Sequence, residues 1–213
     1  MEETKVFPKM FTWLGIGLLI SFLTGYVLST NMNILISILS LGLWPIIILE
    51  FGLAIVMGVA INKMSPTVAG ICYIAYCLIT GVTFSTIFIL FDISSVISIF
   101  AICSMIFALL ALYGYFTKTD LSRFGTVLFI GLIGLVLGEL INAFIFKSMQ
   151  TEVIFSAIGV AIFVGYIAYD VNKVKRMLPY LGEDKAAIYG AFQLYLDFIN
   201  LFIRLLELFG KRK

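Results

Sequence analysis

Five polar residues recur at helical spacing along the last apolar segment of the chain, residues 187–209. Their steps of four, three, four and three positions place all five on one stripe of a helix, whose other faces are Leu, Ile, Phe and Tyr. A charged side chain at the bilayer centre costs at least about 2.5 kcal/mol, so such residues are expected to face a cavity or a partner. The stripe therefore predicts one wall of an internal cavity. It consists of Gln193, Asp197, Asn200, Arg204 and Glu207.

An aspartate on the preceding segment is predicted to face this stripe. Asp170 and Asp197 flank the last expected loop, 179–187, at nearly equal distances along the chain. At 1.5 Å per residue they lie about 12 and 15 Å from the loop ends, so their carboxyl groups are expected to meet about a third to halfway into the membrane. By the same rise Glu50 lies about 16 Å from the inner end of its own segment, which would put three acids in one layer.

Two carboxyl groups in contact titrate as a pair, and their oxygens are the ligands that a hard cation such as Ca²⁺ takes. We therefore expect the charge of Asp170 and Asp197 to be offset by a shared proton, by a cation such as Ca²⁺, or by a basic group from the inner end of the helices. A cofactor bound more tightly than a permeant Ca²⁺ is not expected.

A second group of charges lies farther along the same stripe. Arg204 and Glu139 each come roughly 22 to 26 Å from the same end of their helices, so they are expected to pair, with Glu207 as a local alternative one turn away. Arg204 cannot neutralise Asp197, because seven residues separate them by about 10 Å. This group is a candidate gate, or alternatively a charge cluster at the membrane boundary that only joins helices or reaches water.

The composition is that of an integral membrane protein surrounded by lipid. Of 213 residues, 62% are hydrophobic and 12% are charged, where a soluble domain would carry about 25% charged residues. A net charge of +2 gives no reason to expect a nucleic-acid partner. The chain contains no histidine, which excludes His-based metal sites and Ser-His or Cys-His catalysis, and we do not expect an enzyme.

Seven segments are long and apolar enough to span a membrane, which predicts an all-α fold with one seven-helix domain over residues 1–213. Charge asymmetry between the connections predicts a cytoplasmic N-terminus and a C-terminus outside. The expected segments are 9–29, 34–61, 67–91, 94–116, 124–146, 152–178 and 187–209. The inner side would then carry Lys5, Lys9, Lys63, Lys118, Arg123, Lys173, Lys175, Arg176 and Lys185, and the outer side Lys147, Lys211, Arg212 and Lys213.

Two stretches give the chain a family resemblance. Residues 166–170 read Tyr-Ile-Ala-Tyr-Asp and residues 194–203 read Leu-Tyr-Leu-Asp-Phe-Ile-Asn-Leu-Phe-Ile. They resemble the last two helices of the transmembrane Bax-inhibitor-motif (Bax inhibitor-1-like) family, most of all its bacterial YetJ-type calcium-leak proteins. The shorter stretches 49–50, 81–83 and 118–122 fit the same pattern.

The resemblance implies seven helices with the last one central and surrounded by the other six. It implies a pH-sensitive calcium leak in a bacterial plasma membrane, with Asp170 and Asp197 as the sensor and Glu50 as a pore-side acid. In the YetJ-type proteins an arginine near the inner end of the second helix latches to the sixth-helix aspartate. Here that neighbourhood contains Lys63, so two alternatives are open: Lys63 is a looser latch, because an ammonium is a point charge, or the latch is absent.

Two other functions use the same acids. Tyr169-Asp170 resembles the first motif of presenilin-type intramembrane aspartyl proteases, but their Gly-x-Gly-Asp motif is absent, since bulky residues precede Asp197. A proton-coupled cation exchanger would also need paired acids. Ca²⁺ flux that persists without a proton gradient distinguishes a leak from an exchanger.

Overall fold

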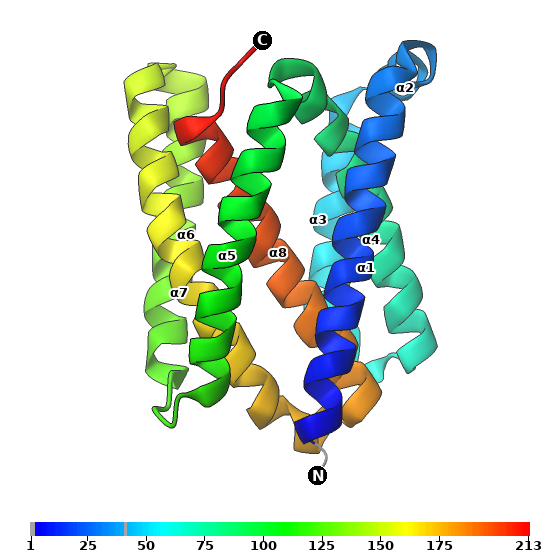
Figure 1. The fold of residues 1–213 in the computed structure, drawn as a ribbon, viewed down its shortest axis with the longest axis vertical. Coiled ribbons are helices and arrows are strands. Elements are labelled where there is room, and N and C mark those ends of the chain that lie inside the picture. Colours follow the sequence, from blue (N-terminus) through cyan, green and yellow to red (C-terminus); the bar gives the residue numbers. More distant parts are fainter. Residues whose placement is uncertain (1–2, 41) are drawn as a thin grey trace. The chain divides into compact units, whose positions relative to one another are not determined.

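Helices account for nearly all of residues 3–40 and 42–213, which are the residues that the computed structural model describes (Figure 1). The chain forms the following elements, in which η1 is a 3-10 helix and η2 a π-helix. They are α1 (Glu3–Thr30), α2 (Met32–Leu39), α3 (Leu43–Ala60), η1 (Ile61–Lys63), α4 (Pro66–Leu90), α5 (Ile93–Phe116), α6 (Ser122–Ile141), η2 (Asn142–Phe146), α7 (Met149–Leu181) and α8 (Glu183–Phe209).

Seven of these helical stretches are long and apolar enough to cross a membrane, which confirms the predicted all-α membrane fold. The last helix is the most deeply buried of the seven. In its apolar window 78% of the residues are buried, against 11% to 44% in the other six. This burial confirms the central position expected for the last helix and explains how it carries a polar stripe in an apolar surrounding.

The segment expected at 34–61 is two helices and not one. The short α2 ends at Leu39, and α3 begins after Gly42, whose φ of 89° is a left-handed conformation that favours glycine. Pro45 then lies in the first turn of α3, where its missing N–H leaves no helical hydrogen bond unmade. The apolar periodicity continues across this break, so hydropathy alone did not reveal it.

The connection between α7 and α8 is also shorter than expected. A loop over 179–187 was predicted, but Gly182 alone joins the two helices, with a φ of 73°. Asp170 lies twelve residues before this turn and Asp197 fifteen after it, so the assumed equal offset is wrong by three residues. Three residues are about 4.5 Å, or just under one turn, which carboxyl groups on facing helices can bridge.

The chain forms two compact units, and α7 and α8 contribute to both. The first unit contains Met1–Asp92 with Met177–Tyr195 and Lys213, and the second contains Ile93–Arg176 with Leu196–Arg212. That the whole chain acts as one domain stays a prediction.

In the first unit, α1 and α4 pack side by side (Figure 1). Their backbones approach closely at Gly17 and Gly25, where a Cβ would collide with side chains of α4. Buried aromatic rings fill the space beside α8, with Tyr73 and Tyr195 packed edge to face. The hydroxyl groups of Ser21 and Tyr195 are 2.5 Å apart, so a polar contact also ties α8 to α1.

In the second unit, α6 and α7 pack side by side (Figure 1), and a Cβ at Gly138 would meet the ring of Phe155. A Cβ at Gly114 would collide with the carbonyl of Ala168, so α5 and α7 approach to backbone contact two residues before Asp170. On α8, Phe198 packs against aromatic rings of α5. These contacts fix the part of α7 that carries Asp170 relative to the part of α8 that carries Asp197.

Candidate functional site

Two buried aspartates form the first part of the candidate site. Asp170 on α7 and Asp197 on α8 are each 4% exposed, and their carboxyl groups lie close enough to interact directly. Near them along the same helices, the apolar residues Val171 and Leu201 are fully buried. An ionised carboxylate can only accept, so a hydrogen bond between two carboxyl groups requires a proton on one of them.

The cation that the structure pairs with this site is Lys173, one turn along α7. Its Nζ lies 3.8 Å from Oδ1 of Asp170 and 5.7 Å from the centre of the Tyr169 ring. The second carboxyl oxygen of Asp197, Oδ2, is buried and has no hydrogen-bond partner among the described residues. The negative charge of the pair is therefore compensated at Asp170, while one carboxyl oxygen of Asp197 has no hydrogen-bond partner among the described residues.

A small polar cluster continues from α7 to the loop before α6. Arg176 donates to Asn172 on its own helix at 2.5 Å and to Asp120 in the loop at 3.3 Å. The hydroxyl and the backbone N–H of Ser122 both donate to Asp120, and these hydrogen bonds lower the pKa of Asp120 below its ordinary value. This cluster holds the end of α7 that lies beyond the aspartate pair.

Glu50 lies in the first unit, on α3. The hydroxyl of Thr80 on α4 donates to its Oε1 at 2.8 Å, and its carboxyl group also lies near Tyr76. The carboxyl group is half-buried and is satisfied by a neutral donor. The three-acid layer and the pore-side role of Glu50 stay predictions.

Lys63 ends the short helix η1, also in the first unit, and is exposed. Within residues 3–40 and 42–213 no ion pair is found for it. Its role as a latch for Asp170 stays a prediction, whereas Lys173 already provides a cation at that carboxyl group.

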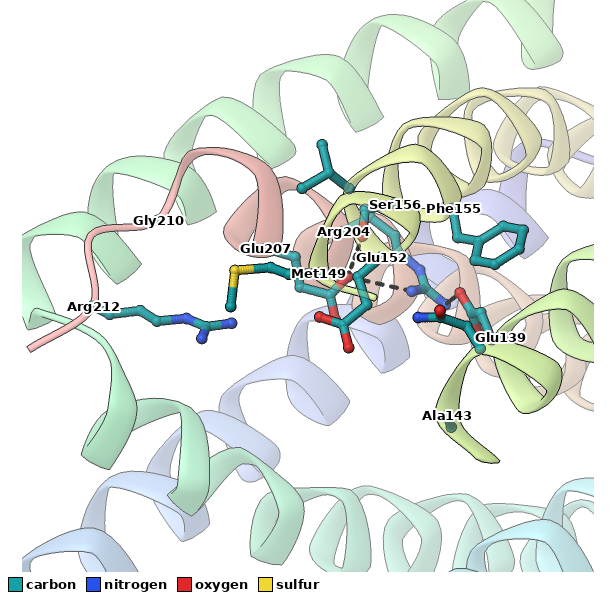
Figure 2. A pocket seen from close by; sticks show the side chains of 12 residues that line it. Glu139, Ala143, Met149, Glu152, Phe155, Ser156, Arg204, Glu207, Gly210 and Arg212 are labelled. Atoms are coloured by element: carbon teal, nitrogen blue, oxygen red, sulfur yellow. Dashed lines mark hydrogen bonds and ion pairs between the residues drawn. The ribbon is translucent and has the colours of Figure 1, made fainter. Parts of the chain in front are cut away.

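An ion cluster around Arg204 is the second part of the site. Nη2 of Arg204 lies 2.6 Å from Oε1 of Glu139 on α6, and Nη1 lies 3.3 Å from Oε2 of Glu207. The hydroxyl of Ser156 on α7 donates to the same oxygen of Glu207 at 2.6 Å. The structure therefore joins Arg204 to both of its expected partners, and the cluster links three helices (Figure 2).

This cluster lies in a cavity of about 630 Å³ in the second unit. Figure 2 shows the guanidinium of Arg204 between the two carboxylates, with Glu152 and Arg212 directed into the same space. Side chains from α6, η2, α7 and α8 surround it, together with the C-terminal residues. The lining residues are Glu139, Asn142, Ala143, Met149, Glu152, Val153, Phe155, Ser156, Arg204, Glu207, Gly210 and Arg212.

Several residues of both clusters escaped the sequence analysis. The sequence places Lys173 only among the basic residues of the inner side, although its i,i+3 spacing from Asp170 is a signal that indicates an ion pair with that carboxyl group. Ser156 carries no such signal, because its contact with Glu207 joins positions far apart in the sequence. The same holds for Thr80 beside Glu50.

A ready-made multidentate metal site is not present in the described part of the chain, where no group of three or more His, Cys, Asp or Glu side chains converges. Asp170 and Asp197 can still offer carboxylate oxygens to a cation. Water or backbone oxygens would have to complete the six to eight ligands that Ca²⁺ takes.

Known proteins resemble this chain over nearly its whole length. The family model described as Inhibitor of apoptosis-promoting Bax1 matches residues 3–213. Inner membrane protein YbhL of Escherichia coli K12 is 37% identical, over 96% of this chain and 91% of the relative. An uncharacterized protein of Borreliella burgdorferi is also 37% identical, over 99% and 94%. An uncharacterized membrane protein of Streptococcus pyogenes serotype M3 is 33% identical, over 97% and 93%.

Proposed function

Because the chain belongs to the Bax inhibitor-1 family of integral membrane proteins, we propose that it is a pH-sensitive Ca²⁺ leak whose sensor is the pair Asp170 and Asp197. The protein lets Ca²⁺ pass down its gradient and catalyses no covalent reaction. Its relationship to an inner membrane protein of Escherichia coli supports a bacterial plasma membrane as its location. The N-terminus is cytoplasmic in this proposal, as the distribution of basic residues predicts.

The observation that carries the proposal is the close approach of two buried carboxyl groups on α7 and α8. With one shared proton the pair holds the two helices together and carries one negative charge. When that proton leaves, two negative charges face each other in an apolar surrounding, which is unfavourable unless they separate or a cation joins them. The protonated pair therefore corresponds to the closed state, and the doubly ionised pair to the Ca²⁺-conducting state.

The partial compensation of the pair supports a switch in preference to a static ion pair. The ion pair of Lys173 is with Asp170, at 3.8 Å, and Oδ2 of Asp197 has no hydrogen-bond partner within the described residues. The ion pair with Lys173 balances the charge of one carboxylate and leaves the other carboxylate without an ion pair within the described residues. A deprotonated pair would thus retain a net negative charge, which attracts a divalent cation.

Ca²⁺ flux into liposomes that contain the purified protein tests the proposal. Flux is measured with an internal fluorescent Ca²⁺ indicator from pH 5 to pH 8, with equal pH on both sides of the membrane. We expect flux that rises with pH and persists without a proton gradient. Asp197→Asn removes the repulsion within the pair and should flatten the pH profile.

Asp184→Asn is the matched control, because it makes the same chemical change at an exposed position of the same helix. It should keep the wild-type pH profile. Flux that requires a proton gradient would indicate an exchanger and contradict the leak. An unchanged pH profile in Asp197→Asn would mean that the sensor lies elsewhere.

A further inference from the structure

The ion cluster in the cavity of the second unit sets the positive charge of Arg204 against the negative charges of Glu139 and Glu207. We infer that Arg204 determines the fixed charge of this cavity, and so limits cation permeation, by balancing Glu139 and Glu207. This inference rests on the proposed Ca²⁺ leak. It assigns Arg204 a role in permeation that is separate from the aspartate sensor.

The charge balance follows from the lining residues. Three glutamates and two arginines line the cavity, which gives a net charge of −1 when all are ionised. Within the cluster itself, one guanidinium faces two carboxylates. Loss of the Arg204 charge would leave both carboxylates uncompensated, whereas loss of one carboxylate would make the cluster neutral. The two changes therefore alter the local charge in opposite directions.

The surrounding helices hold the side chain of Arg204 in position. Its side chain is 16% exposed and passes the backbone of α7 at Gly159, where a Cβ would come within 3.1 Å of Nε. Its two terminal nitrogens engage different carboxylates, a fork that a lysine ammonium could not reproduce in the same geometry. The guanidinium is thus held in place and does not extend freely to the membrane boundary.

The position of Arg204 relative to the aspartate pair makes its charge relevant to permeation. It lies on the same stripe of α8 as Asp197, about 10 Å away along the helix axis. That distance is too long for direct neutralisation of Asp197, but it is within the range over which a charge in a poorly screened cavity changes the energy of an approaching cation. Arg204 therefore acts most strongly on a cation inside its own cavity and more weakly, across about 10 Å, on the protonation of the pair.

Four variants test the inference in the same liposome assay. Arg204→Gln should raise the Ca²⁺ flux per folded molecule about two- to tenfold, and Glu139→Gln should lower it by a similar factor. The double variant Glu139→Gln with Arg204→Gln restores the original net charge and should return flux to near the wild-type rate. The pH midpoint should shift by less than about one unit in the two single variants and should stay at the wild-type value in the double variant.

Arg212→Gln is the matched control, because it removes the same charge from an exposed residue of the same cavity, where water and salt screen it. It should change flux less than Arg204→Gln does. If Arg204→Gln does not fold, Glu139→Gln and Glu207→Gln test the same balance, since each should lower flux.

The failures of the two proposals can be told apart. A wild-type protein that carries no Ca²⁺ overturns the proposed leak and this inference together. Wild-type flux combined with a loss of flux in both Arg204→Gln and the double variant overturns only the inference, because a structural role predicts damage that restored charge does not repair. Flux unchanged in every variant also overturns only the inference.

Discussion

The ammonium of Lys173 offers a direct way to move the pH at which the proposed leak opens. Its positive charge favours the ionised form of the carboxyl group of Asp170, 3.8 Å away. Lys173→Met keeps the length of the side chain and removes the charge. The pair should then retain its shared proton to higher pH, and the pH midpoint of Ca²⁺ flux should rise.

The expected size of this shift follows from the distance. Two unit charges 3.8 Å apart interact by about 4 kcal/mol at an effective dielectric constant of about 20 and by about 1 kcal/mol in water. The side chain of Lys173 is 26% exposed, so solvent screens part of the interaction and a value near 1 to 2 kcal/mol is reasonable. Since about 1.4 kcal/mol corresponds to one pH unit, the midpoint should rise by about one unit.

The assay is the liposome flux measurement over a pH series, with Lys173→Arg and Lys118→Met as controls. Lys173→Arg keeps the charge and should leave the midpoint near that of the wild type. Lys118→Met removes a charge from an exposed loop of the same unit and should have no effect. A midpoint that stays in place in Lys173→Met, while Asp197→Asn still flattens the profile, would refute the assigned contact. A midpoint that falls would refute the sign of the coupling.

Three further predictions concern stability and gating. Gly159→Ala places a Cβ 3.1 to 3.2 Å from the side chain of Arg204, so overpacking should destabilise the protein by about 1 to 3 kcal/mol and lower its Tm in detergent. Adding Arg204→Ala to the same chain should recover part of the lost stability. An unchanged Tm in Gly159→Ala would show that the helices adjust freely. Lys63→Ala should raise flux at low pH, but less than twofold, because an ammonium is a weak latch; flux that does not change would leave Lys63 as a solvated surface charge. The pKa of Asp120 lies below its ordinary value of 3.8 because Ser122 donates to the carboxylate, so this stabilisation is present above pH 3.8 and is lost as the pH falls through the lower folded value. Asp120→Asn should therefore have a lower Tm than the wild type near neutral pH, and the two Tm values should converge in acid; a constant difference would contradict the assignment.

The relatives at 37% identity make it possible to test which of the two clusters, the aspartate pair or the Arg204 cluster, has the same role in other members of the family. Where YbhL carries aspartates at the positions that correspond to Asp170 and Asp197, replacing the second of them by asparagine should flatten the pH profile as Asp197→Asn does in this chain. The Arg204 cluster should transfer only where a relative carries both the arginine and its two carboxylates. Flux measured on both proteins under the same conditions would answer both points.

Local signals in the sequence determined the architecture. Seven apolar stretches of spanning length follow from composition alone, because a backbone in lipid must satisfy its hydrogen bonds within helices. The polar stripe through Asp197 and Arg204 predicted a buried last helix, since charges on a membrane helix must turn away from lipid. The pairing of Arg204 with Glu139 and Glu207 followed from depth along helices of constant rise.

Tertiary structure decided what depends on backbone breaks and side-chain packing. Gly42 divides one apolar stretch into α2 and α3 without interrupting the hydropathy pattern, and Gly182 replaces the expected nine-residue loop by a single left-handed residue. The cation beside Asp170 is Lys173, because a flexible lysine one turn away on the same helix can reach the carboxyl group in this packing. Gly159 opens the space that Arg204 occupies, and only the close approach of α7 and α8 gives that glycine its role. Hydropathy and helical rise are properties of single segments, whereas each of these contacts depends on the three-dimensional fit between segments, which one-dimensional patterns do not contain.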